Sequence, residues 1–255
     1  MTNLIRVEIF KLVQSKTLWL LIIIITGLST LLHSLVITDW WQLSGTEFDR
    51  AQLSELNALS AFTLPLLFSF IVSALAGFHV STEFSQSGVI KNQIISGHHI
   101  AYIYMAKYLV FSLGSIIVTI LIPLLTAIIL VLLFGHGDLI NLSNFTYLGR
   151  AFSLFTLQFL CFTAVVLWIA IGTGDSGQTI IFTLLLSIIM FIIEKFLTYP
   201  VIQLLYENSF FYQFSEVFHY SMTTGEILKS IVIAIISLIV ILSGGMFVFN
   251  RKEIK

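Results

Sequence analysis

Six separate stretches of roughly twenty mostly apolar residues constrain this chain more than any other feature. They cover residues 18–37, 60–80, 108–134, 151–171, 179–198 and 227–249. A helix rises about 1.5 Å per residue, so about 20 residues cross the hydrocarbon core of a bilayer. Barrel strands would instead be short, with apolar and polar residues alternating. The sequence therefore predicts an all-α integral membrane protein, a single transmembrane domain of six helices over residues 1–255.

The charge content supports the same conclusion. Only 10% of the residues are charged and 58% are hydrophobic, with a mean hydropathy of +1.02. Soluble domains carry about 25% charged residues, so we expect the lipid bilayer of the cell membrane to be the solvent of this multi-pass chain. The net charge is −1 without a basic run, which argues against a nucleic-acid partner. The single cysteine, Cys161, cannot form an intramolecular disulfide.

Basic residues predict the orientation, because cytoplasmic segments of membrane proteins are enriched in lysine and arginine. If both termini are cytoplasmic, eight of the twelve basic residues lie inside and four lie outside. The inside set is Arg6, Lys11, Lys16, Lys91, Lys107, Arg251, Lys252 and Lys255, and the outside set is Arg50, Arg150, Lys195 and Lys229. We therefore expect both termini in the cytoplasm.

Residues 2–16 precede the first span and have the pattern of an amphipathic helix. An apolar stripe of Ile5, Ile9, Leu12 and Val13 opposes a polar face of Glu8, Lys11, Gln14 and Ser15. Such a helix is expected to rest in the cytoplasmic membrane interface. Pro123, inside the third span, is expected to kink it, because proline removes a backbone donor.

Motifs for chemistry are scarce. There is no G-x-x-x-x-G-K-[ST] loop, no H-E-x-x-H and no C-x-x-C. Gly172-Thr-Gly-Asp175 spells the G-x-G-D of intramembrane aspartyl proteases, but the other aspartates lie in external loops, so we interpret it as a tight turn. We assign no catalytic, cofactor-binding or metal-ligating residue and do not expect an enzyme.

Glu194 and Lys195 are the one ionisable pair inside an apolar stretch. Charged side chains within the membrane are costly and usually have a function. Glu194 lies roughly 22 Å along a helix that enters from the cytoplasm, near the outer interface, where both side chains can reach water. Two interpretations stay open: an interfacial pair, or an outer gate that faces substrate.

Residues 81–107 form a long cytoplasmic segment between spans two and three. The segment contains Glu83-Phe-Ser-Gln-Ser-Gly88-Val-Ile-Lys91, then Gly97-His98-His99, and ends at Lys107. This order of Glu, Gly, a basic residue, an apolar pair, a turn and Lys resembles the equivalent loop of ABC-2 type permeases. The short helix with Glu8 and Lys11 and the basic tail after span six agree. His98-His99 stands where the family often has arginine, which puts that position's role in doubt.

The resemblance implies a permease subunit of an ATP-binding-cassette exporter. It implies a coupling helix in the 81–107 segment, with Glu83, Gly88, Lys91, Gly97, His98 and His99 as the residues that contact a separate ATPase. That partner, a dimer, would hold the ATP and Mg²⁺, and this chain would bind no cofactor. A second permease, identical or not, would complete the path. In size the chain is most similar to small Gram-positive permeases that expel toxic or antimicrobial amphipathic peptides, such as those of the staphylococcal phenol-soluble-modulin exporter.

Three alternatives remain. Permeases of the lantibiotic-immunity and bacitracin-resistance type are similar in size and kind. A membrane scaffold or sensor would bind a partner without transport. An intramembrane enzyme would need clustered polar residues at matching depths on several spans, which the sequence does not show. The 23 phenylalanines either pack against lipid and neighbouring helices or line a lateral path for amphipathic peptides.

The orientation can be tested with single cysteines. In a Cys161→Ser background, Lys91→Cys should resist an impermeant thiol reagent in intact cells, whereas Glu47→Cys and Tyr212→Cys should react. The reason is the eight-to-four distribution of basic residues. Strong labelling at position 91 in intact cells would contradict both the orientation and the assignment of a coupling segment.

Overall fold

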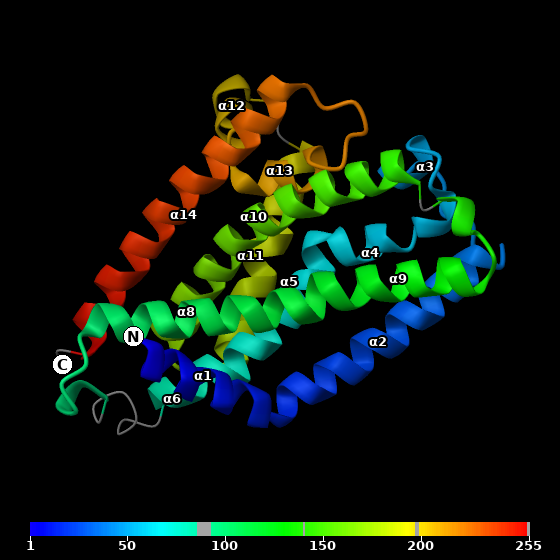
Figure 1. Cartoon of the computed structure of the whole chain (residues 1–255). Coiled ribbons are helices and arrows are strands. Elements are labelled where there is room, and N and C mark those ends of the chain that lie inside the picture. The colour runs from blue at the N-terminus through cyan, green and yellow to red at the C-terminus, as the bar shows by residue number, and fades with distance from the viewer. Residues whose placement is uncertain (86–92, 140, 197–198, 254–255) are drawn as a thin grey trace.

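Residues 1–85, 93–139, 141–196 and 199–253 are described by a computed structural model (Figure 1). Every regular element within them is helical. Six of these helices are long and apolar enough to cross a membrane: Lys16–Ile37, Pro65–Phe84, Ile100–Leu133, Leu142–Thr173, Ser176–Glu194 and Thr224–Arg251. The prediction of an all-helical, multi-pass chain with six helices of spanning length is confirmed.

The long elements follow one another with short helices between them. The helices before and within the spans are α1 (Thr2–Gln14), α2 (Lys16–Ile37), α5 (Pro65–Leu75) with η2 (Ala76–Ser81) and α6 (Thr82–Ser85), α8 (Ile100–Ile116) with η3 (Ile117–Leu121) and α9 (Ile122–Leu133), α10 (Leu142–Thr173), α11 (Ser176–Phe196) and α14 (Thr224–Glu253). The short connecting helices are α3 (Glu47–Arg50), η1 (Ser54–Leu56), α4 (Leu59–Thr63), η4 (Gly137–Leu139), α12 (Pro200–Glu207) and α13 (Phe210–Glu216).

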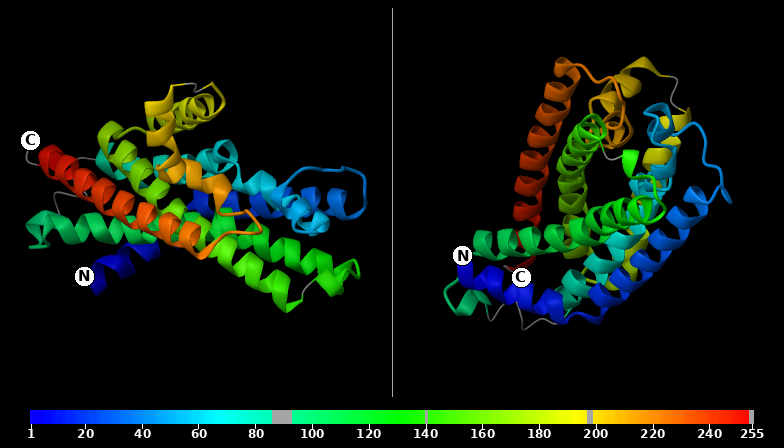
Figure 2. Two further views of the ribbon diagram at one scale, coloured as in Figure 1. Left: turned by 90° about the horizontal axis from the view of Figure 1, so that it is seen from above. Right: turned by 45° about the vertical axis from the view of Figure 1, so that its right-hand side comes forward.

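The two ends of the bundle are built differently. The start of α1 and the end of α14 lie near one another, at what we name the terminal end (Figures 1 and 2). The opposite end, named the cap end, carries the short helices α3, α4, α12 and α13 (Figure 1). If all six helices cross the membrane, both termini lie on the same side, and which side that is stays a prediction.

Two spans begin well before the apolar stretches that revealed them. The third begins at Ile100 instead of residue 108, and the fourth at Leu142 instead of residue 151. Each start is marked by a cap: the side chain of His99 accepts from the backbone of Ala101, and that of Asn141 accepts from Asn144. Hydropathy locates the apolar part of a helix, whereas caps decide where its hydrogen bonds start. Lys107, which we had expected in a loop, therefore lies inside α8.

The distortion expected at Pro123 takes the form of a π-helical segment. The five residues of η3 widen the turn immediately before the proline. Pro123 has no N–H, and its ring crowds the carbonyl of Thr119 four residues earlier, so a wider turn relieves the clash. A second π-helical segment, η2, lies near the end of span two.

Hydrogen bonds between small polar side chains join neighbouring spans. The hydroxyls of Ser81 and Thr179 are 2.7 Å apart and connect η2 to α11. The Gln158 amide donates to the Ser230 carbonyl at 2.9 Å and connects α10 to α14. Cys161 lies one turn further along α10 and is fully buried, as expected of a small apolar residue. Such contacts matter in lipid, where apolar side chains alone give little preference for protein neighbours.

Phenylalanine rings fill the bundle toward the cap end. The ring of Phe68 on α5 lies 4.8–6.0 Å from those of Phe155, Phe159, Phe162 and Phe214. Phe214 belongs to α13, which connects spans five and six along the chain, so this short helix inserts its aromatic face among the spans. These five rings pack against one another, which favours the packing interpretation over a lateral path at this position.

The turn between spans four and five is as tight as the Gly172-Thr-Gly-Asp175 pattern predicts. Gly174 has a φ of +64°, which favours glycine, and it ends α10. Asp175 then accepts a hydrogen bond from the Gln178 backbone at 2.8 Å and so caps α11. The aspartate is used as a helix cap.

Gly77 permits a close contact between spans two and five. A Cβ added there would lie 2.9 Å from the backbone oxygen of Ser176, which cannot move aside as a flexible side chain could. Gly77→Ala should therefore destabilise the protein by about 1–3 kcal/mol, measured as thermal unfolding in detergent. Gly27→Ala is the matched control, since a Cβ there meets nothing within 4 Å. Equal stability of the two variants would contradict the close contact.

Candidate functional site

Four charged side chains from three elements meet at the terminal end of the bundle. The Lys11 ammonium lies 3.0 Å from the Glu8 carboxylate and 2.9 Å from that of Glu83. The Lys107 ammonium lies 3.1 Å from Glu8 and also pairs with Glu83. Each cation thus contacts both anions. We name these four residues the charge quartet.

The charge quartet joins α1 to the second and third spans. Glu8 and Lys11 lie on α1, Glu83 on α6 and Lys107 two turns into α8. The side chains of Glu8 and Lys107 are each only 3% exposed, whereas that of Lys11 is 28% exposed. Lys107 therefore depends on the two carboxylates for nearly all of its charge compensation.

Glu8 lies on the face of α1 that packs against the rest of the protein. The residues buried on this helix are Leu4, Glu8 and Leu12, spaced four apart on one face. Ile9 and Val13, which belong to the apolar stripe expected in the membrane interface, are 40% and 49% exposed. Glu8 faces the protein because the Lys107 ammonium lies there and compensates its charge. Contact between that stripe and the membrane interface stays a prediction.

Mutual compensation favours the ionised forms of Glu8 and Lys11. Burial opposes ionisation of Glu8, but Lys107 and Lys11 outweigh it and hold the pKa of Glu8 below its ordinary value of 4.5. Burial likewise opposes the charge of Lys11, but contacts with Glu83 and Glu8 raise its pKa above 10.5. The two positive and two negative charges sum to zero, as burial of ions requires.

These pKa shifts fix the pH range in which the charge quartet stabilises the fold. A carboxyl whose pKa falls on folding stabilises above its unfolded pKa, and that contribution is lost as the pH falls through the folded value. An ammonium whose pKa rises stabilises below its unfolded pKa, and that contribution is lost as the pH rises through the folded value. Glu8 and Lys11 therefore both contribute between about pH 5 and about pH 10.

An exposed segment lies next to the charge quartet along the chain. Residues 93–95 are helical and a turn at residues 96–97 follows. Gly97 has a φ of +83°, as the expected tight turn requires. Ile95 is 81% exposed, and His98 and His99 are exposed as well. The Nδ1 atom of His99 accepts a bond from the Ala101 backbone at 3.3 Å and so begins α8.

The six residues predicted to couple to an ATPase thus fall into separate groups. Glu83 points into the charge quartet, so it joins elements within the chain. Gly97, His98 and His99 lie together on the exposed segment. Gly88 and Lys91 lie outside the described residues. For all six residues, contact with an ATPase stays a prediction. The ion pairs of Glu83 with Lys11 and Lys107 were not predicted from the sequence.

Glu194 and Lys195, the expected outer-gate pair, lie near the end of α11 on the cap side. Glu194 is exposed and accepts a hydrogen bond of 3.3 Å from the Tyr206 hydroxyl of α12. The side chain of Lys195 is outside the described residues. The contact with Tyr206 joins span five to the cap, and it leaves both the gate and the interfacial interpretation open.

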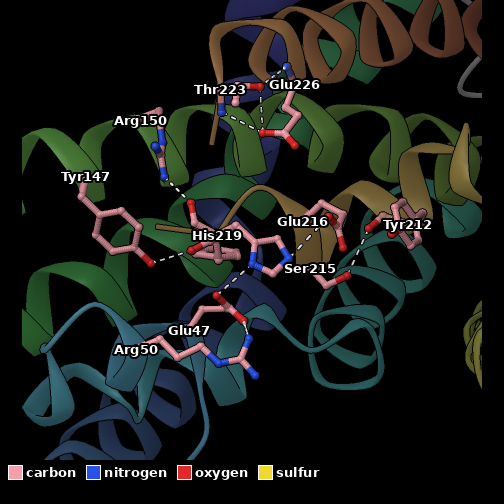
Figure 3. Close-up of polar contacts among 11 residues, drawn as sticks. Glu47, Arg50, Tyr147, Arg150, Tyr212, Ser215, Glu216, His219, Thr223 and Glu226 are labelled. Atoms are coloured by element: carbon pink, nitrogen blue, oxygen red, sulfur yellow. Dashed lines mark hydrogen bonds and ion pairs between the residues drawn. The ribbon is translucent and has the colours of Figure 1, made fainter. Parts of the chain in front are cut away.

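A second polar network holds the cap together (Figure 3). His219 lies between two carboxylates, 3.1 Å from Glu47 of α3 and 3.4 Å from Glu216 of α13. Arg150 of α10 donates to the carbonyls of His219 at 2.5 Å and Tyr220 at 3.2 Å. Residues 47, 150 and 219 therefore bind three separate stretches of chain to one another.

No family model matches the chain, and no curated protein and no solved structure shows significant similarity to it.

Removing one member of the charge quartet should be costly. Lys107→Met leaves two buried carboxylates with the one partly exposed Lys11, so we expect a loss of about 3–5 kcal/mol in unfolding free energy, measured by thermal unfolding in detergent. Glu8→Gln combined with Lys107→Met restores neutrality and should cost less than Lys107→Met alone. Lys16→Met, at an exposed lysine, is the control. Equal stability of Lys107→Met and Lys16→Met would show that the ion pairs do not hold these elements.

Proposed function

We propose that this chain is the membrane-spanning permease subunit of an ATP-binding-cassette exporter, driven by a separate ATPase and carrying amphipathic peptides. The observation that carries the proposal is the charge quartet. It joins Glu83, at the start of the segment between spans two and three, to Lys107 on span three and to α1, which leads into span one. A force applied to that segment would therefore reach three spans together.

The exposed segment supplies a surface for a partner. Ile95 is an apolar side chain exposed at the terminal end, with His98 and His99 beside it. A groove on an ATPase would cover the isoleucine and pair with polar atoms of the histidines, as apolar anchors with polar rims do at protein interfaces. The same segment carries the residues by which the chain resembles ABC-2 type permeases, so two independent lines of reasoning point to one surface.

The mechanism follows from a rigid link between a docking segment and several spans. Nucleotide binding would draw two ATPase subunits together and pull on the docked segments. Because the charge quartet couples α1, α6 and α8, these elements would move as a body, and the bundle would switch between two arrangements. This chain contributes the displacement and the ATPase contributes the free energy.

We propose that the cargo path lies at the boundary with a second permease. The space between α5, α10 and α13 is filled by the rings around Phe68, so the middle of this part of the bundle is packed. Amphipathic peptides as cargo come from the resemblance to small exporter permeases, and a path between two permeases would leave room for them.

The docking surface can be tested at Ile95. Ile95→Asp places a charge where an apolar contact is expected, so co-purification of an ATP-binding-cassette ATPase with the tagged chain from its native membrane should fall at least about tenfold. Substrate-dependent ATP hydrolysis should fall with it. The melting temperature of the chain should not change, because Ile95 is 81% exposed.

Leu142→Asp is the matched control for Ile95→Asp. Leu142 is 83% exposed but lies at the cap end, where no ATPase would dock. It should retain the ATPase and its hydrolysis. Glu83→Ala is a poorer test, since it breaks the charge quartet and would disturb the fold as well as the coupling. If Ile95→Asp retains full ATPase binding, stimulation and export, the docking proposal is wrong.

A further inference from the structure

The imidazole of His219 lies between two carboxylates that come from different parts of the cap (Figure 3). Its Nδ1 atom is 3.1 Å from Glu47 of α3, and its Nε2 atom is 3.4 Å from Glu216 of α13. A neutral imidazole has one N–H group, whereas an imidazolium has two. Both ring nitrogens can therefore donate toward a carboxylate only when the ring is protonated. A neutral ring would turn a lone pair toward one of the two.

The backbone that carries this ring is held in place independently of its charge. Arg150 of α10 donates to the carbonyls of His219 at 2.5 Å and of Tyr220 at 3.2 Å. The Tyr147 hydroxyl, on the same helix, donates to the carbonyl of Phe218 at 2.7 Å. None of these hydrogen bonds involves the imidazole. A change in the charge of the ring therefore acts on its carboxylate partners and leaves its own backbone attached to α10.

The charges around the ring balance only when the ring carries its second proton. Four carboxylates contact the ring or share the hollow of about 270 Å³ beside it: Glu47, Glu207, Glu216 and Glu226. Three cations lie with them: Arg50, which pairs with Glu47, Arg150, and Lys229 in the hollow. Tyr212 also lines the hollow, and burial and Glu216 raise its pKa above the ordinary value of 10.0, so it is neutral. With a neutral His219, one negative charge of this set is left without a counterpart.

The pH range in which the ring changes charge follows from its chemistry. Histidine gains or loses its proton between about pH 5 and pH 8, whereas carboxylates and arginines keep their charges there. The contact of His219 with both carboxylates is therefore complete at the acidic end and loses one member as the pH rises. An apolar contact limits the change, because the ring of Phe48 on α3 lies 5.5 Å from that of Phe218 and Phe48 is only 1% exposed. Loss of the proton loosens the polar edge of α3 while Phe48 stays buried.

We propose that His219 is a pH-sensitive link between α3, which follows span one, and the connection from α13 to span six. In acidic solution the imidazolium joins Glu47 to Glu216. In neutral or alkaline solution the ring releases one of them, and α3 moves more freely against this connection. The side chain of His219 is 44% exposed, so protons reach it from water without unfolding of the cap. The inference goes beyond the proposed function, because the link requires neither an ATPase nor transport.

The experiment measures the distance between two spin labels by pulsed electron paramagnetic resonance, on the full chain in nanodiscs. The labels are attached to Ser44→Cys, shortly before α3, and Thr224→Cys, at the start of α14, in a Cys161→Ser background. Both positions are exposed. Between about pH 5 and about pH 8, the ratio of short to long distances should fall about two- to fivefold, as expected when a partly exposed ion pair is lost.

Substitutions at position 219 should remove this response in two opposite ways. His219→Gln is neutral throughout, so its ratio should stay at the low, alkaline value at both pH values. His219→Lys is positive throughout, so its ratio should stay at the high, acidic value. His136→Gln is the matched control, because His136 is also at the cap end but lines a different hollow, and it should keep the wild-type response.

Three results would overturn the proposal. The first is a ratio that does not change with pH when His219 is present, a comparison that needs no substitution at this position and so does not depend on how a variant folds. The second is a full response in both His219→Gln and His219→Lys, which would place the pH-sensitive group elsewhere. The third is loss of the response in His136→Gln together with its retention in His219→Gln, which would assign it to His136.

Discussion

The bundle depends on contacts between helices that lipid chains cannot provide. An apolar side chain gains little by exchanging lipid for protein, so the association of spans requires close approach, polar bonds or well-fitted rings. This chain uses all three. Gly77 brings η2 against the start of α11, the Ser81–Thr179 bond lies nearby, and the rings around Phe68 join α5, α10 and α13. These contacts hold the arrangement, and the apolar surface keeps it in the membrane.

The two ends of the molecule treat charge in opposite ways. At the terminal end, each of the two cations contacts both anions, so the charges of the quartet sum to zero. At the cap end, three carboxylates and one ammonium line a hollow between α12, α13 and α14, and Glu207 makes no ion pair with any cation in the described residues. The charge quartet therefore suits a rigid connection between α1, α6 and α8.

Hydropathy was enough to predict the spans, because bilayer thickness fixes the length of any helix that crosses it. It could not place their ends, since caps such as Asn141 are local polar contacts with no hydropathy signal. Nor could it orient α1: Glu8 finds Lys107 across 99 residues of sequence, and no local pattern reports that. The insertion of α13 did have a signal, because Phe210, Phe214 and Phe218 recur at helical spacing.

The π-helical segment η3 fixes how the two halves of span three are rotated relative to each other. Each residue of a helix turns the chain by about 100°, so a single insertion or deletion rotates everything beyond it. The wide turn at residues 117–121 separates α8, which carries Lys107, from α9, whose buried face is Pro123, Ala127 and Val131. Loss of one residue there would restore a regular helix but swing that small-residue face toward lipid. The span therefore consists of two helical halves, α8 and α9, and the number of residues in η3 determines which face of α9 packs against the protein.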